Sequence, residues 1–123
     1  MPLEEKGDRA KRLQSELTRF VDVLAAQDDV SCVVVFGSLA SESVDDESDL
    51  DMMIVSDTDD PFIKRLQKVR RLLCPKVATD FLVYNPREVT ELWKTRPFVR
   101  DEILKHGKVL YERERGTLAR LCA

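Results

Sequence analysis

Two aspartates, Asp49 and Asp51, open an apolar segment near the middle of the chain and are separated by a single residue. Because side chains alternate faces along a strand, both carboxylates are expected on the same side of this segment. Neighbouring carboxylates repel each other, and a cation between them keeps both ionised. Oxygen ligands without a nearby Cys or His favour Mg²⁺, or Mn²⁺, over zinc. The pair therefore predicts a divalent-metal site that can hold two ions for displacement at phosphorus.

A Gly-Ser pair, Gly37 and Ser38, ends the preceding apolar run, and ten residues separate it from Asp49. Glycine adopts backbone torsions that other residues resist, and it lets a phosphate approach the main chain. Serine is a good helix N-cap, and its hydroxyl can donate to a phosphate oxygen. We expect a short helix over 38–43 whose first N–H groups face an anion. This loop would hold a triphosphate tail beside the metal site.

Each half of this pattern also has a simpler explanation. A Gly-Ser after a strand is usually a turn, and an Asp-x-Asp is usually a solvated acidic patch. The segment 45–56 does not fit a calcium-binding EF-hand loop, because Leu50 stands where Gly is needed and Ser56 where Glu is needed. The two halves at this spacing, each beside an apolar strand, favour a functional interpretation.

A third carboxylate, Asp80, interrupts the β-leaning apolar run 76–84. Burying an unpaired carboxylate is costly, so a cation or hydrogen-bond donors should accompany it. Asp80 could ligate a catalytic metal and help to take up the proton of an attacking hydroxyl. The alternative is an aspartate on a half-exposed strand.

The apolar periodicity predicts the elements that position these residues. We expect helices over 4–27, 61–73, 86–94 and 98–106, and strands over 31–36, 50–55, 77–84 and 108–111, with a polar loop over 43–48. The basic residues of the helix over 61–73, Arg65 among them, are expected on its solvated face. Trp93 and Phe98 are expected to pack beneath a helix junction, with stacking on a base as the alternative. His106 has no Cys or His partner nearby and is rejected as a metal ligand.

Gly37-Ser38, Asp49-x-Asp51 and the later strand residue Asp80 together resemble the polymerase-beta-like nucleotidyltransferase superfamily. The small size resembles its minimal nucleotidyltransferase group. The resemblance implies an α/β (α+β) fold, in which a mixed β-sheet has its helices packed mainly on one face and the aspartates on the open face. It also implies that the three aspartates are catalytic and bind two Mg²⁺ ions, while Gly37 and Ser38 bind the phosphates of an NTP, with ATP as the expected donor.

The implied activity is transfer of a nucleoside monophosphate from an NTP to an acceptor hydroxyl, with release of pyrophosphate. Two alternatives stay open. By resemblance, the chain could be the antitoxin of a pair with a small helical HEPN-type protein, acting by binding this partner or by transferring AMP to it. It could also be a catalytically idle nucleotide-binding module, because no basic residue follows Ser38 until Lys64, whereas many members carry an Arg shortly after the Gly-Ser.

Composition bounds these interpretations. The 123 residues predict one domain over 1–123, with a core over 10–112 and a charged tail over 113–123. The net charge of −3, from 20 basic and 23 acidic residues, gives no general attraction to nucleic acid. Three cysteines without a Cys-x-x-Cys pair do not suggest a disulfide framework. With no apolar run for secretion or membrane crossing, we expect a cytoplasmic protein.

Overall fold

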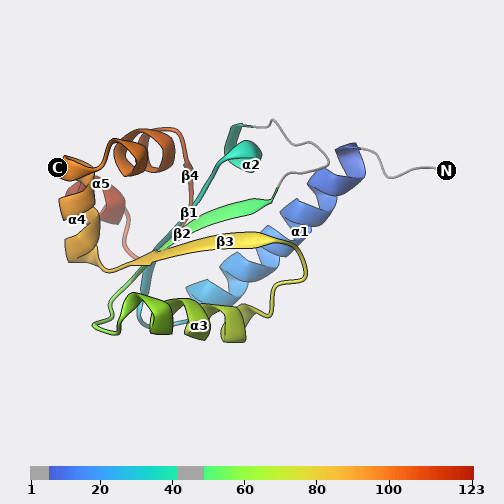
Figure 1. Ribbon diagram of the computed structural model, residues 1–123, viewed down its shortest axis with the longest axis horizontal. Helices are drawn as coiled ribbons and strands as arrows, with labels where there is room; N and C mark the ends of the chain where they lie inside the picture. The colour runs from blue at the N-terminus through green and yellow to red at the C-terminus, as the bar shows by residue number, and fades with distance from the viewer. Residues whose placement is uncertain (1–5, 42–48) are drawn as a thin grey trace.

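A four-stranded mixed sheet organises the chain in a computed structural model, which describes residues 6–41 and 49–123 (Figure 1). The strand order is β3-β2-β1-β4. β1 runs antiparallel to both β2 and β4, whereas β2 and β3 are parallel. The strands are β1 (Val30–Phe36), β2 (Leu50–Ser56), β3 (Thr79–Tyr84) and β4 (Lys108–Glu112). The α/β fold class with a mixed sheet is confirmed.

Apart from α5, which lies in the segment predicted only as a charged tail, the described helices agree with the predicted ones to within a few residues. They are α1 (Lys6–Ala25), α2 (Ser38–Ser41), α3 (Phe62–Leu73), α4 (Pro86–Thr95), the π-helix η1 (Phe98–Lys105) and α5 (Thr117–Leu121). The polar loop expected over 43–48, and the end of the helix expected over 38–43, lie outside the described residues. No helix in the described part of the chain is long and apolar enough to cross a lipid bilayer.

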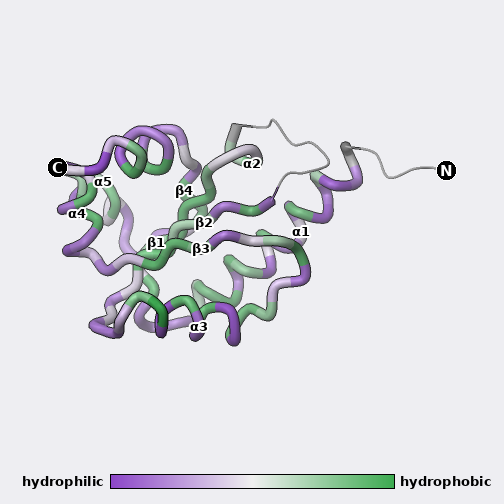
Figure 2. The backbone as a smooth tube through the Cα atoms, in the orientation of Figure 1, coloured by the Kyte–Doolittle hydropathy of each residue, from purple (hydrophilic) through white to green (hydrophobic). Residues whose placement is uncertain are grey.

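The two longest helices, α1 and α3, cover one face of the sheet (Figure 1). The inner strands are apolar on both faces, as expected for strands with packing on each side, and Figure 2 shows this hydrophobic centre. Phe20 of α1 lies against Phe81 of β3, with ring centroids 5.9 Å apart. Further buried residues of this face are Leu13, Leu17, Leu24, Val33, Val35, Leu50, Met52, Ile54, Val69, Leu73 and Val83.

The shorter elements α4, η1 and α5 pack on the opposite face and gather at one end of the molecule (Figure 1). Their buried residues Val89, Ile103 and Leu118 meet Cys32 and Met53 of the sheet. Burial raises the pKa of the Cys32 thiol to about 12, so this residue packs as a small apolar group. Among the described residues, Asp51 near the beginning of β2 is half-buried and Asp80 near the beginning of β3 is exposed, so this end of the second face is the more open one.

Arg65 corrects one sequence-based expectation, because it is buried rather than solvated. Its Nε donates to the carbonyl oxygen of Asp60 at 2.8 Å, and its Nη1 donates to the Val83 carbonyl at 3.1 Å and to Glu88 Oε1 at 2.6 Å. β3 is an edge strand, so its outward carbonyl groups need donors from outside the sheet. The hydrophobic pattern of α3 could not reveal this need for hydrogen-bond donors, because the carbonyl groups belong to β3, which follows α3 in the sequence.

Glu16 ties α1 to the segment that leads into β3. This buried carboxylate accepts hydrogen bonds from Arg19 Nε at 2.8 Å and Arg19 Nη2 at 3.0 Å. It also accepts one from the backbone N–H of Lys76 at 2.6 Å. The hydrogen bond from Arg19 is the largest cause that lowers the pKa of Glu16. Because Lys76 lies just ahead of β3, this contact helps to fix the strand that carries Asp80.

We expect Glu16→Gln to lower the free energy of unfolding by about 1–3 kcal/mol at neutral pH. The folded-state pKa of Glu16 is lowered, so its contribution is complete above the pKa of an unfolded glutamate, about 4.3, and is lost as the pH falls through the lower folded-state value. Urea unfolding of wild type and variant should therefore differ at pH 7 and converge in acid. The exposed Glu91→Gln is the control. A difference that is independent of pH would contradict this explanation.

Candidate active site

The parallel pairing of β2 and β3 places Asp51 directly beside Asp80. Each is the second residue of its strand, and the two are register partners. Asp51 is also the partner of Phe36 on β1, so Phe36, Asp51 and Asp80 form one row across three strands. Partners in adjacent strands present their side chains on the same face of the sheet. Two carboxylates that are distant in the sequence therefore lie together on the open end of the second face.

Asp49 lies just ahead of β2, and its side chain is 46% exposed. Burial is the largest cause that raises the pKa of Asp51, and the negative charges of Asp80 and then Asp49 raise it further. The three predicted carboxylates therefore form one electrostatic cluster. Their roles in metal binding and catalysis stay predictions, which this geometry makes possible.

Gly37 closes the site from the end of β1. Its φ of 74° lies in the left-handed region, which glycine adopts without the steric cost that a Cβ causes. A Cβ added to Gly37 would overlap Oδ2 of Asp51, so the absence of a side chain makes room for this carboxylate. Ser38 follows as the first residue of the short helix α2. The two residues of the predicted phosphate loop thus adjoin the carboxylate cluster.

Within 6–41 and 49–123, no three Asp, Glu, His or Cys side chains form a ready-made set of metal ligands. Asp51 and Asp80 do lie close enough to share a side-chain hydrogen bond, which is one of the causes that raise the pKa of Asp51. An all-oxygen donor set still fits Mg²⁺, because this ion is usually held by one or two carboxylates together with substrate phosphates and water. The Asp51 carboxylate fills the space that the missing side chain of Gly37 leaves, so an ion bound to Asp51 would lie close to the main chain of the Gly-Ser pair.

A groove of about 420 Å³ adjoins the carboxylate cluster, within the usual range of small-molecule sites, roughly 300–1,000 Å³. Asp51 and Asp80 form its acidic part. The remaining lining residues are mostly apolar or aromatic: Phe36, Leu66, Arg70, Phe81, Leu82 and Phe98. Phe98 was expected to pack beneath a helix junction, but 55% of it is exposed. Trp93 is half-buried, with Lys105 Nζ 5.9 Å from its ring centroid.

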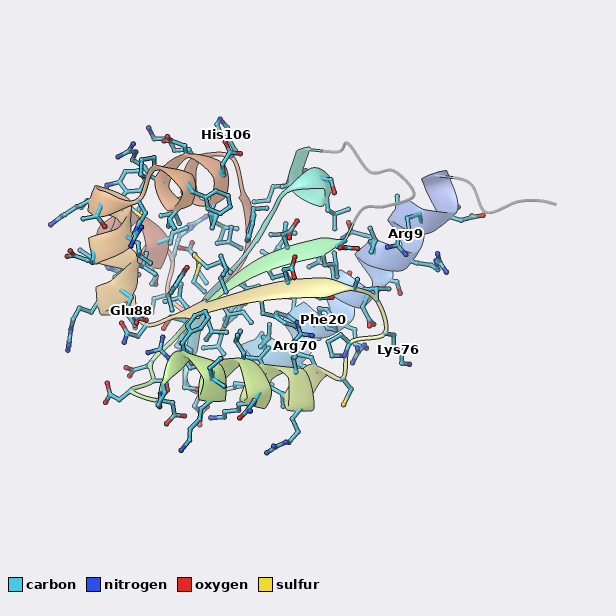
Figure 3. All side chains as sticks on the ribbon, in the orientation of Figure 1. Arg9, Phe20, Arg70, Lys76, Glu88 and His106 are labelled. Atoms are coloured by element: carbon cyan, nitrogen blue, oxygen red, sulfur yellow. The ribbon has the colours of Figure 1, made fainter. Side chains whose placement is uncertain are left out.

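Two arginines that the sequence analysis did not single out flank the cluster. Arg9 of α1 lies beside the beginning of β2 (Figure 3), with its Nη2 atom 3.8 Å from Oδ1 of Asp49. Arg70 of α3 lines the groove, and its Nη2 atom donates to the Thr79 carbonyl at 3.0 Å (Figure 3). Both come from helices outside the Gly-Ser and Asp-x-Asp segments, so the local pattern held no signal for them.

The sequence profile described as polymerase beta, nucleotidyltransferase matches residues 19–116. This range is most of the chain and includes every predicted site residue, so the chain belongs to the polymerase beta nucleotidyltransferase family. Among solved structures, that of a candidate nucleotidyltransferase from Sulfolobus solfataricus is similar, with a TM-score of 0.64 and 18% sequence identity. The similarity covers 93% of each chain and supports the fold. The search of curated proteins finds no match to this chain.

Proposed function

We propose that this protein transfers a nucleoside monophosphate from an NTP, with ATP as the donor, to an acceptor hydroxyl and releases pyrophosphate. One observation carries the proposal: the cross-strand pair of Asp51 and Asp80, joined electrostatically by Asp49, lies against a glycine that leaves space for it. Membership of the nucleotidyltransferase family supports this class of reaction.

The three aspartates are proposed to hold two Mg²⁺ ions, for which Mn²⁺ can substitute. When bound, Mg²⁺ offsets phosphate charge and polarises the phosphorus that is attacked. Asp51 is half-buried, so its carboxylate is the most constrained member and the one that gains most from a cation. Asp80 is exposed on an edge strand, where an acceptor can approach it. We assign to Asp80 the acceptance of the hydroxyl proton.

The proposed reaction forms one bond, breaks one bond and needs one proton acceptor from the protein. The acceptor oxygen bonds to the α-phosphorus, its proton passes to the Asp80 carboxylate, and the bond between the α-phosphorus and the bridging oxygen breaks. Pyrophosphate leaves with the electron pair of that bond. Gly37 and Ser38 are proposed to hold the leaving phosphates, and Arg9 and Arg70 to supply positive charge that the Gly-Ser loop itself lacks. The free thiols Cys32, Cys74 and Cys122 suit a reducing compartment, and we place the reaction in the cytoplasm.

The test is a transfer assay with ATP labelled at either the α- or the γ-phosphate, in the presence of Mg²⁺. Acceptors should include small alcohols and hydroxyl-bearing proteins, among them a small helical HEPN-type partner. We expect label from the α-phosphate on the acceptor, equimolar pyrophosphate, and no transfer in EDTA. Transfer of γ-label instead, or full activity in an Asp49→Asn/Asp51→Asn double variant, would contradict the proposal.

A further inference from the structure

Phe98 is an exposed aromatic residue in a position that its own packing does not explain. It is the first residue of η1, and 55% of it is accessible to solvent. Its ring nevertheless has a defined contact, because it meets Phe36 at a centroid distance of 6.2 Å and an interplanar angle of 84°. This edge-to-face geometry is a favourable one for aromatic pairs. The ring is therefore held by Phe36 and still presents apolar surface outward.

The groove joins Phe98 to the carboxylate cluster. Phe98 and Leu82 line it together with Asp51 and Asp80, and Phe36 lies in the same cross-strand row as the two aspartates. One part of the groove is thus acidic and suited to cations, and the adjoining part is apolar and aromatic. An NTP has the same two parts, because its metal-bound phosphates are joined through a ribose to a flat aromatic base.

We propose that Phe98 is the stacking surface for the nucleobase of the bound NTP. This inference rests on the proposed function, since the phosphates must lie at the aspartates and Gly37 for the base to reach Phe98. Stacking on a phenyl ring accepts any base, because every base has a π-face. The site should therefore bind nucleoside triphosphates as a class more tightly than it binds the triphosphate group alone. The π-helical winding of η1, which is rare and frequently found at functional sites, agrees with this assignment.

The experiment compares the affinities of MgATP and Mg-tripolyphosphate by isothermal titration calorimetry. Wild type should bind MgATP the more tightly, on the order of tenfold, because tripolyphosphate has no base to stack. Phe98→Ala should lose this preference by weakening only MgATP binding. Phe98→Leu keeps apolar volume against Phe36 but has no flat ring, and should behave likewise, whereas Phe98→Tyr should keep the preference. Ile63→Ala removes a similarly exposed apolar side chain of α3 that does not line the groove, and it is the control.

A spectroscopic readout separates stacking from a merely structural effect. The triphosphate of 2-aminopurine riboside should lose fluorescence when it binds wild type or Phe98→Tyr, and lose less with Phe98→Leu at the same saturation. If wild type binds MgATP and tripolyphosphate but the Phe98 variants leave the preference and the quenching unchanged, the inference is wrong and the proposed function stands. Equal weakening of both ligands also overturns stacking. If wild type binds neither ligand, the proposed function fails, and the stacking inference fails with it.

Discussion

Replacing Asp51 with asparagine is expected to lower nucleotidyl transfer on the order of 10³-fold and to make the metal-free protein more stable. The first effect follows from the central place of Asp51, which is half-buried between Phe36 and Asp80 in the cross-strand row. An amide is a weaker cation ligand than a carboxylate and carries no charge to offset that of a metal ion. Several kilocalories per mole of transition-state stabilisation correspond to the stated loss.

The second effect follows from the raised pKa of Asp51, which burial causes first and the charges of Asp80 and Asp49 increase. The folded protein holds the Asp51 proton more tightly than the unfolded chain does. Stability therefore decreases as the pH rises from the ordinary aspartate pKa, about 3.9, to the raised value, and the penalty is complete above it. Asparagine has no such penalty. The same carboxylate that is costly without metal is the one that a bound cation stabilises.

Thermal unfolding in EDTA tests directly whether Asp51→Asn stabilises the metal-free protein. The melting temperature of Asp51→Asn should exceed that of wild type at pH 8, and the difference should shrink toward pH 4. Asp57→Asn, an exposed aspartate beyond β2, is the matched control and should change neither stability nor transfer. Adding Mg²⁺ should raise the melting temperature of wild type more than that of Asp51→Asn. A variant that is less stable than wild type in EDTA would contradict the electrostatic explanation.

Gly37→Ala is expected to reduce transfer by about 100-fold, since an error of about 1 Å in the position of a reacting group has a cost of this size. The new Cβ would overlap Oδ2 of Asp51, so the carboxylate must move away from its place beside Asp80. The backbone also has a φ of 74° at this position, which costs alanine about 1–2 kcal/mol. Activity and stability should therefore both fall.

The chain provides a control that separates these two causes. Gly116 has a similar φ of 83°, but a Cβ there would find its nearest neighbour, Nη1 of Arg120, at 3.8 Å. Gly116→Ala should have the same backbone strain, with a stability loss of about 1–2 kcal/mol, and keep its activity. Equal activities of the two alanine variants, measured below both melting temperatures, would show that Gly37 has no role in positioning Asp51.

The features predicted well from the sequence are those set by local pattern. Short apolar runs predicted the strands, with Asp51 near the start of one run and Asp80 within another. The direct pairing of Asp51 with Asp80 could not be predicted from these runs, because it depends on the register of β2 against β3. Before the structure, only the resemblance to a known family grouped Asp80 with Asp49 and Asp51, as residues that together would bind metal.

The features that were missed depend on neighbours that are distant in the sequence. Arg65 is buried because an edge strand needs donors, and no residue near Arg65 in the sequence shows this demand. Arg9 and Arg70 reach the site from two different helices, so the sequence of the Gly-Ser loop does not indicate them. Phe98 was expected to pack beneath a helix junction, with stacking on a base as the alternative, but more than half of it is exposed and it lines the groove.

The most direct test of the central claim is the location of the metal in crystals grown with Mn²⁺ and a non-hydrolysable ATP analogue. Anomalous diffraction identifies manganese independently of any assumption about its ligands. The proposed function predicts two manganese peaks between the phosphates and the carboxylates of Asp49, Asp51 and Asp80, with Gly37 beside the phosphates. Ordered nucleotide with its manganese at other residues, and no peak at these three aspartates, would contradict it.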